Sequence, residues 1–502
     1  MNDATHTQRP AVIHDGISRR QLLGLGASGL AGTLFSPRAL AVASAQEGAP
    51  PPGGPRLLLK GGSVLTLDRS LGAADRADVL LEDTKIKAVA PNLQPNGAQV
   101  IDCSGMIVMP GFVDTHRHMW QGLLRNIGPD DLLLDYLNKM LFGFAPQLTP
   151  DDVYLGDLIT ALSALNAGIT TILDWSHINA TPQHAEAAIR ALQDAGIRAV
   201  YAYGPNFGVT PAWYDNLDHP YPGDIRRLRH QYFSSSDQLL TLALAAAGPE
   251  FAPVDAAEIE WKIAREVGAR ISVHVGVGQG GQQGRLGQLA DRVGLKDDTT
   301  YIHACTLSDA EWDRIRATGG TVSLAIPIEM QMGHGMPPIQ RALDRGIRPS
   351  LSVDVETNQP TDMFTQMRAC FALQRALLNE QHLFRAPDPD LEQLRAKLLT
   401  VRDVLEFATI EGARANGLAH KIGTLTPGKE ADLIVLRTTQ PNVAPVNNTV
   451  GAVVLGMDSS NVDAVFVTGK AVKWRGQLVG VDVEGLRHRA ERAREALLAK
   501  VN

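Results

Sequence analysis

Two histidines one residue apart, His116 and His118, end an apolar run in the stretch PGFVDTHRHMWQG. Because side chains alternate between the two faces of a β-strand, both imidazoles point the same way and Arg117 points to the opposite face. Two imidazoles on one face pack poorly in a core unless they bind something, and neutral imidazole is a common ligand of divalent metals. The pair alone leaves two interpretations open, part of a metal site or two solvated histidines at a strand end.

Eight apolar runs, separated by stretches with helical spacing, must position these side chains. We expect strands over residues 112–118, 169–175, 197–204, 240–247, 270–276, 299–304, 321–327 and 348–355. Strands that alternate with helices form parallel sheets, and eight such units close naturally into a (β/α)8 TIM barrel. Several of the runs are continuously apolar, as strands covered on both faces require. The sequence therefore predicts an α/β fold with a barrel over residues 110–420.

Short β-like runs flank the barrel on both sides. Residues 57–109 hold one set, and residues 421–480 hold another that includes the runs 422–437, 450–456 and 462–476. Two β-rich ends around one middle predict a small β-sandwich that is built from both ends of the chain. We expect a C-terminal helix over residues 481–502.

Polar side chains gather at the carboxyl ends of the predicted strands, where barrel enzymes place their chemistry. They are His116 and His118 on the first strand, Asp174 and His177 on the second, His274 on the fifth, His303 on the sixth, Glu329 near the seventh and Asp354 on the eighth. Five of the 14 histidines occupy these few positions. A lone histidine here is usually a core residue, but several at matching depth indicate a metal site.

The stretches PGFVDTHRH, VHV, IHA, SVDVETN, AGITTILDW and the late segment ATIEGARANGL…IGTLTPGKEADLIVL resemble the amidohydrolase superfamily, in its cytosine deaminase and triazine hydrolase branch. The resemblance covers nearly all of the chain after residue 56. It implies that His116, His118, His274 and Asp354 bind one divalent metal, with His303 beside it.

Three imidazoles and one carboxylate suit Zn²⁺, or alternatively Fe²⁺, and leave room for a water molecule. Such a metal lowers the pKa of its bound water towards about 7, which makes hydroxide available. Asp354 can then accept the proton of that water, and His303 can polarise the group under attack or stabilise its charge.

The chain departs from the superfamily at two positions. Binuclear members carry a bridging lysine on the fourth strand, whereas LLTLALAAAGPEF (239–251) contains none, so a single metal is expected. Deaminases of this branch place a glutamate three residues after the fifth-strand histidine, and here that position is Val277. Glu329 or His334 is a candidate replacement for the acid, unless Glu329 is only structural or the substrate needs no acid.

A long connection over residues 203–233 is rich in aromatic side chains, which can form flat apolar walls around a ring-shaped ligand. An oligomer contact or a loop with its own small core explains the same aromatics. The candidate substrate-binding residues are Trp120, Gln121, His177, Phe207, Trp213 and His334.

These observations predict a mononuclear metal-dependent hydrolase that acts on non-peptide carbon–nitrogen bonds of a heterocyclic or aromatic small molecule, as a deaminase or amidohydrolase. Two alternatives stay open: displacement of halide or alkylamine from a heteroaromatic ring, and a catalytically silent binding protein. A cytidine-deaminase zinc site requires a PCxxC motif, and the three cysteines, Cys103, Cys305 and Cys370, do not form one.

The N-terminal region predicts export. Paired Arg19 and Arg20 precede a weakly apolar stretch and small residues that end at Ala45, which is the layout of a twin-arginine signal peptide over residues 1–45. A linker over 46–56 follows, and we expect a periplasmic or extracellular location with no integral membrane segment in the mature form. The net charge of −7 shows no electrostatic footprint for nucleic acid, and a homo-oligomer is compatible with the sequence.

Overall fold

The computed structural model describes residues 53–209, 212–215, 219–387 and 390–501. The predicted signal peptide over 1–45 and most of the predicted linker lie outside the described residues. In the part of the chain that the structure describes, no helix is long and apolar enough to cross a membrane.

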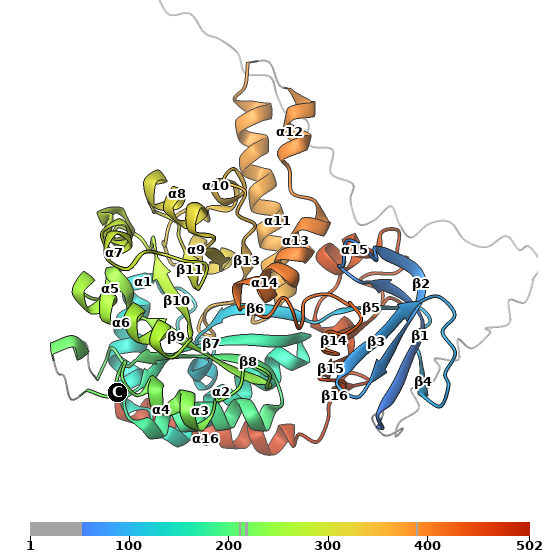
Figure 1. Ribbon diagram of the computed structural model, residues 1–502, viewed down its shortest axis with the longest axis horizontal. Helices are drawn as coiled ribbons and strands as arrows, with labels where there is room; N and C mark the ends of the chain where they lie inside the picture. The colour runs from blue at the N-terminus through green and yellow to red at the C-terminus, as the bar shows by residue number, and fades with distance from the viewer. Residues whose placement is uncertain (1–52, 210–211, 216–218, 388–389, 502) are drawn as a thin grey trace, which may run out of the picture. The chain divides into compact units, whose positions relative to one another are not determined.

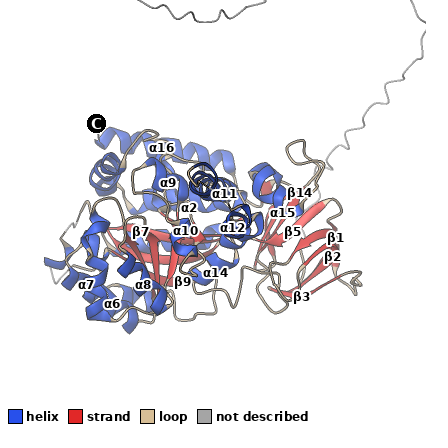
Figure 2. Ribbon diagram, turned by 90° about the horizontal axis from the view of Figure 1, so that it is seen from above, coloured by secondary structure: helices blue, strands red, loops and turns tan. Residues whose placement is uncertain are grey.

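Eight parallel strands form the barrel sheet, in the order of the sequence (Figures 1 and 2). They are β6 (Phe112–Arg117), β7 (Ile169–Asn179), β8 (Arg198–Pro205), β9 (Leu240–Ala246), β10 (Arg270–Val275), β11 (Thr299–His303), β12 (Thr321–Leu324) and β13 (Ser350–Leu351). A parallel bridge between Arg117 and Asp354 connects the last strand to the first. All eight strands lie where the apolar runs predicted them, and the barrel is confirmed.

Helices and short turns connect the strands, and they include the segments that surround the carboxyl ends of the strands. In chain order they are η1 (Met119–Leu124), α1 (Leu133–Tyr136), η2 (Leu137–Phe144), η3 (Ala145–Gln147), α2 (Pro150–Asn166), α3 (Pro182–Ala195), η4 (Trp213–Asp215), α4 (Ile225–Gln231), α5 (Gly248–Phe251), α6 (Val254–Glu266), η5 (Gly280–Gln283), α7 (Arg285–Val293), α8 (Asp309–Thr318), α9 (Ile326–Gln331), α10 (Ile339–Leu343), α11 (Met363–Asn379), η6 (Glu380–Phe384), α12 (Leu391–Lys397), α13 (Val401–Phe407) and α14 (Ile410–Ala415). Capping boxes start several of them. In α8, Ser308 accepts a hydrogen bond from the backbone N–H of Glu311, which satisfies a donor that the helix itself leaves free.

A nine-stranded mixed sheet joins the two ends of the chain, as predicted. Its strands are β1 (Arg56–Leu65), β2 (Ala73–Glu82), β3 (Lys85–Ala90), β4 (Gln99–Asp102), β5 (Met106–Pro110), β14 (Leu433–Arg437), β15 (Val462–Val467), β16 (Lys470–Trp474) and β17 (Gln477–Leu478). Strand β14 pairs with β5 on one side and β15 on the other, so N-terminal and C-terminal segments share one ladder. Buried contacts bind this sheet to the barrel: Arg198 pairs with Asp432 at 2.6 Å, and the Lys473 ammonium donates to the carbonyl of Asn166.

One predicted strand is wrong. The run 450–456 is helical, as α15 (Thr449–Gly451) followed by η7 (Ala452–Gly456), and η8 (Ser459–Asn461) comes next. Asn448 caps this segment by accepting a hydrogen bond from the backbone N–H of Gly451. Its apolar side chains Val453 and Val454 are buried, which a short helix achieves as well as a strand. The chain ends in α16 (Val483–Val501).

Candidate metal centre

Four predicted ligands converge at the carboxyl end of the barrel. His116 and His118 come from the end of β6, His274 from β10 and Asp354 from the residues after β13. Their potential ligand atoms all lie within 4.8 Å of one another. The Nε2 atoms of His116 and His274 are 3.1 Å apart, and Oδ1 of Asp354 lies 3.2 Å from His116 Nε2 and 3.3 Å from His118 Nε2.

Backbone hydrogen bonds fix this arrangement. The Asp354 amide donates to the carbonyl of His116 at 2.9 Å, and the His118 amide donates to the carbonyl of Asp354 at 2.8 Å. Asp354 has a φ of 76° and His303 has a φ of 70°, in the left-handed region that residues other than glycine rarely occupy. Such strained backbone gathers at functional sites, where the surrounding structure imposes it.

The protonation of these side chains suits a metal. Burial lowers the pKa of His116 to about 3 and lowers that of His274 well below its usual range, so both rings are neutral. Burial opposes ionisation of Asp354, yet the neighbouring imidazoles, His116 first, hold its pKa well below the usual range. Neutral imidazoles and an ionised carboxylate are the forms that bind divalent metals.

The distances also fit ligands that share one ion. Atoms that bind the same Zn²⁺ lie about 2.0–2.1 Å from it and therefore about 3–4 Å from one another. Three of the six separations are 3.1–3.3 Å (His116 to His274, and Asp354 to His116 and to His118), and all the ligand atoms lie within 4.8 Å of one another. The Nδ1 of His118 lies 3.0 Å from the carbonyl oxygen of Trp175, which keeps its proton on Nδ1 and leaves Nε2 free to bind.

His303 lies beside these four residues and is oriented by Glu329. Its Nδ1 is 3.2 Å from Oε1 of Glu329, and its Nε2 is 3.6 Å from Oδ2 of Asp354. The same Glu329 oxygen accepts the backbone N–H of Ala325 at 2.8 Å. Burial raises the pKa of Glu329 well above its usual value, and its side chain lies behind His303, outside the cavity lining. Glu329 is therefore not among the described lining residues, and its role as the acid that replaces the missing glutamate stays a prediction.

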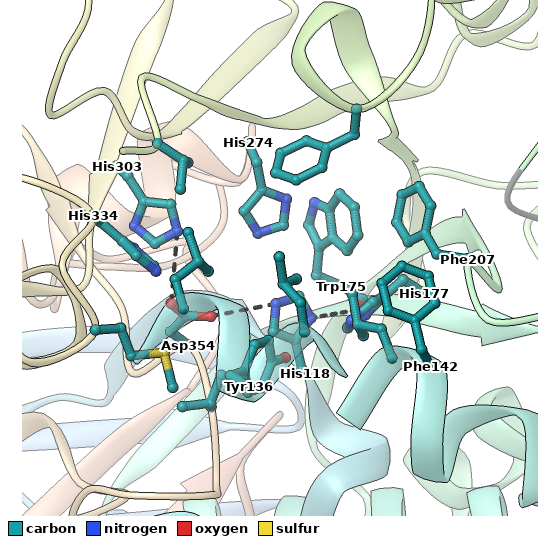
Figure 3. Close-up of a pocket in the computed structure, with 17 residues that line it drawn as sticks. His118, Tyr136, Phe142, Trp175, His177, Phe207, His274, His303, His334 and Asp354 are labelled. Carbon is teal, nitrogen blue, oxygen red and sulfur yellow. Dashed lines mark hydrogen bonds and ion pairs between the residues drawn. The ribbon is translucent and has the colours of Figure 1, made fainter. Parts of the chain in front are cut away.

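A cavity of about 210 Å³ opens at this cluster (Figure 3). Among the described residues its lining consists of His118, Leu133, Tyr136, Leu137, Leu141, Phe142, Trp175, His177, Phe207, Phe251, His274, Val277, His303, Met332, His334, Asp354 and Val355. Three predicted substrate-binding residues, His177, Phe207 and His334, are in this lining. His334 is buried against His303 at 4.5 Å between ring centroids, and neither of its ring nitrogens has a hydrogen-bond partner among the described residues.

The other three predicted substrate-binding residues lie behind the wall. The indole of Trp120 faces Nδ1 of His177 at 3.4 Å, and the amide of Gln121 donates to the hydroxyl of Tyr136 at 2.6 Å. Trp213 packs edge-on against Tyr221 in the core. None of the three is among the described lining residues, although Trp120 and Gln121 contact the lining residues His177 and Tyr136, and their roles in substrate binding stay predictions. Among the described residues of the long connection after β8, Phe207 alone lines the cavity.

Sequence reasoning missed the segment α1–η2, which supplies a whole wall. Leu133, Leu137 and Leu141 recur every four residues, which places them on one face of a helical segment. Tyr136 and Phe142 complete this wall. The spacing was readable in the sequence, but nothing in it showed that this face turns toward the metal cluster.

The position that lacks the expected glutamate is part of the cavity. Val277 lines it, while the nearby carboxylate of Glu250 accepts the backbone N–H of Gly276 at 2.6 Å. Burial raises the pKa of Glu250 to about 7, but this side chain does not belong to the lining. The cavity wall at this point is thus apolar.

The model of the amidohydrolase family matches residues 107–472. Among curated proteins, the 5'-deoxyadenosine deaminase of Methanosarcina mazei is 26% identical over 455 residues, covering 89% of this chain and 99% of the relative. The 5-methylthioadenosine/S-adenosylhomocysteine deaminase of Pyrococcus furiosus is 25% identical over 418 residues, covering 82% of this chain and 93% of the relative.

Solved structures share the fold. A zinc-bound adenosine deaminase from Xanthomonas campestris superposes with a TM-score of 0.75 at 21% identity, covering 88% of this chain and 98% of that one. The zinc complex of atrazine chlorohydrolase from Arthrobacter aurescens TC1 gives a TM-score of 0.71 at 20% identity, covering 87% and 100%.

Proposed function

This chain belongs to the amidohydrolase family, and from that premise we propose that it is a mononuclear metal-dependent hydrolase of a heterocyclic or aromatic small molecule. The bond cleaved is a non-peptide carbon–nitrogen bond. The convergence of His116, His118, His274 and Asp354 at the floor of a cavity carries this proposal. Deaminases among the relatives and zinc in two neighbouring structures support it.

The four residues would hold one divalent metal, for which zinc is our first choice and iron the alternative. When bound, the metal supplies a water molecule that is acidic enough to ionise near neutral pH. Asp354 has a second oxygen, Oδ2, which faces His303 and can accept a proton from that water. His303 is held by Glu329 with its Nε2 toward the centre, where it can hold a proton or bind the reacting group.

A second group of potential ligands consists of His303, His334 and Asp354. It shares Asp354 with the first group, and strand β9 carries no lysine that could bridge two metals. We therefore propose one metal per chain. A stoichiometry of two would contradict this part of the proposal.

A second candidate reaction is displacement of a halide or alkylamine from a heteroaromatic ring. Val277 favours it, because an apolar side chain cannot protonate a ring nitrogen next to the carbon under attack. A substrate whose leaving group departs without protonation of the ring would react in this cavity without the missing acid.

The test combines metal analysis with product release. We expect close to one zinc or iron per wild-type chain, and loss of most of it in His116→Ala and Asp354→Asn. His488→Ala, at an exposed histidine of α16, is the matched control and should keep its metal. Release of ammonia, amine or halide from aromatic amides, amines and triazines should depend on the same metal. A folded wild-type protein that contains no metal and cannot be reloaded would overturn the proposal in favour of a silent binding protein.

A further inference from the structure

The polar side chains of the cavity lining belong to the metal cluster or lie next to it. Ten of the lining side chains offer no hydrogen bond to a ligand. They are Leu133, Leu137, Leu141, Phe142, Trp175, Phe207, Phe251, Val277, Met332 and Val355. The indole N–H of Trp175 already donates to the carbonyl of Ser272 at 3.3 Å, so it offers nothing to a ligand. Among the described lining residues there is no lysine, arginine, serine, threonine or amide, and Asp354 is the one carboxylate.

In Figure 3, His303 and His334 lie beside Asp354 on one side, and His177, Phe142 and Phe207 lie on the other. His177 is the one polar side chain on that second side among the described lining residues that Figure 3 labels there; its ring lies 4.0 Å from that of the proposed ligand His118, and its Nδ1 lies 3.2 Å from the carbonyl oxygen of Trp175. His334 lines the cavity, and neither of its ring nitrogens has a hydrogen-bond partner among the described residues, so this ring is a candidate contact for one polar atom of a substrate.

Tyr136 offers a further hydrogen-bond donor at this end. Its hydroxyl accepts a hydrogen bond from Gln121, so its own proton is left for another acceptor. Burial raises the pKa of Tyr136, which keeps that proton in place.

The mouth of the cavity is apolar as well. Phe142 lines the cavity and is also 53% exposed, so it lies at the boundary with solvent. Large apolar side chains are also exposed on the segments that supply the walls: Leu132, Leu134, Phe251, Met330 and Met336. The Leu133 amide donates to the carbonyl of Met332 at 3.0 Å, which joins two of these segments.

We propose that the substrate is an uncharged molecule whose polar atoms are confined to the end that meets the metal, while its remaining body is apolar. This inference rests on the proposed function and specifies its substrate class. A charged group or a diol in that body would lose its hydration against leucine and phenylalanine side chains and gain no partner. Each unpaired buried polar group costs about tenfold or more in affinity.

The proposal separates this chain from its named relatives. A 5'-deoxynucleoside carries a ribose diol next to its base, and the described lining supplies no carboxylate or amide that could bind a diol away from the metal end. The relatives named for such substrates are 25–26% identical to this chain, which leaves room for a different pocket.

A matched pair of ligands tests the inference without requiring turnover. 5'-Deoxyadenosine and 9-benzyladenine share the base and its exocyclic amine, but the second replaces the sugar with an apolar ring. Calorimetry on the zinc-loaded protein should give a dissociation constant about 10- to 100-fold lower for 9-benzyladenine. Equal affinities, tighter binding of the nucleoside, or no binding of either compound would overturn the substrate class.

A surface-matched pair of variants locates the effect. Phe142→Ser should weaken binding of 9-benzyladenine about tenfold and leave the nucleoside nearly unchanged. Phe384→Ser, at a 76% exposed phenylalanine of η6 that is not in the lining, should change neither. Equal effects of the two substitutions on binding would contradict the inference that Phe142 contacts the apolar part of the substrate. Ammonia release from either compound tests the proposed function separately, so a binder that is not hydrolysed would refute the reaction and leave the substrate class standing.

Discussion

The Nδ1 atom of His303 lies 3.2 Å from Oε1 of Glu329, and this oxygen also accepts the backbone N–H of Ala325. Because Oε1 already accepts the Ala325 N–H, we assign the ring proton of the neutral His303 to Nδ1, which then donates to the same oxygen. Its Nε2 therefore presents a lone pair toward Asp354, which is 3.6 Å away. Glu329 thus positions a neighbouring residue, and it does not touch the cavity.

Glu329→Leu removes the acceptor and should lower kcat by about 10- to 100-fold, because the ring loses its fixed tautomer. Metal content should stay near the wild-type value, since Glu329 is not a proposed ligand. Glu329→Gln keeps an oxygen acceptor and should recover most of the activity. Steady-state kinetics and metal analysis check this, and an inactive Glu329→Gln with normal metal would show that the carboxyl group itself reacts.

A buried ion network supports the loop that carries the metal ligands. Arg117 pairs with Asp114 at 2.8 Å and with Glu356 at 2.6 Å, and all three side chains are buried. Arg117→Leu leaves the buried Asp114 carboxyl without its cation and leaves Glu356 with Arg125 alone, so it should lower the free energy of unfolding by about 3–5 kcal/mol. Arg226→Leu, which breaks an exposed pair with Glu266, should lower it far less, because solvent screens that pair. Urea denaturation compares the two, and similar losses would show that burial does not govern this network.

Two buried carboxyls make stability depend on pH. Burial raises the pKa of Asp174 on β7 to about 8, and burial together with the charge of Asp174 raises that of Asp157 on α2. A carboxyl with a raised folded-state pKa holds its proton more tightly in the folded protein. Its stabilisation is complete below the unfolded value of 3.8 and is lost as the pH rises toward about 8.

Asp157→Asn, which mimics the protonated acid, should therefore flatten the fall in stability across this range and gain on the order of 1–3 kcal/mol at its upper end. Thermal unfolding at a series of pH values measures this. Asp291→Asn, at an exposed carboxyl, should follow the wild-type curve. A wild-type stability that does not fall across this range would mean that the pair is ionised in the folded state.

Export by the twin-arginine route remains a prediction from the sequence. Replacing Arg19 and Arg20 together by lysine should retain the precursor inside the cell and reduce the exported mature form about tenfold or more. Cell fractionation with N-terminal sequencing measures both forms, and the mature chain should begin near Gln46. Unchanged export of the double variant would exclude this route.

The sequence was sufficient for the barrel because each strand is an apolar run bounded by helical spacing. Because parallel strands bring their carboxyl ends to one face, it also predicted that polar side chains would gather there, and the resemblance to amidohydrolases singled out the four proposed ligands. The sequence could not distinguish strand from helix at 450–456, because an apolar run this short shows neither the two-residue period of a strand nor the 3.6-residue period of a helix. Nor could it show that Trp120 faces away from the cavity or that Leu137 faces into it, because the turns after β6 set those directions.

Backbone hydrogen bonds between Asp354 and both His116 and His118 join the first barrel strand to the last. Three of the proposed ligands therefore lie where the barrel closes. A chain that is still being synthesised lacks Asp354 and holds at most an incomplete ligand set. The complete site would then form only after the barrel has closed, and the bound ion would hold the first and last strands together. Loss of the ion would loosen the protein first at this join between its earliest and latest strands.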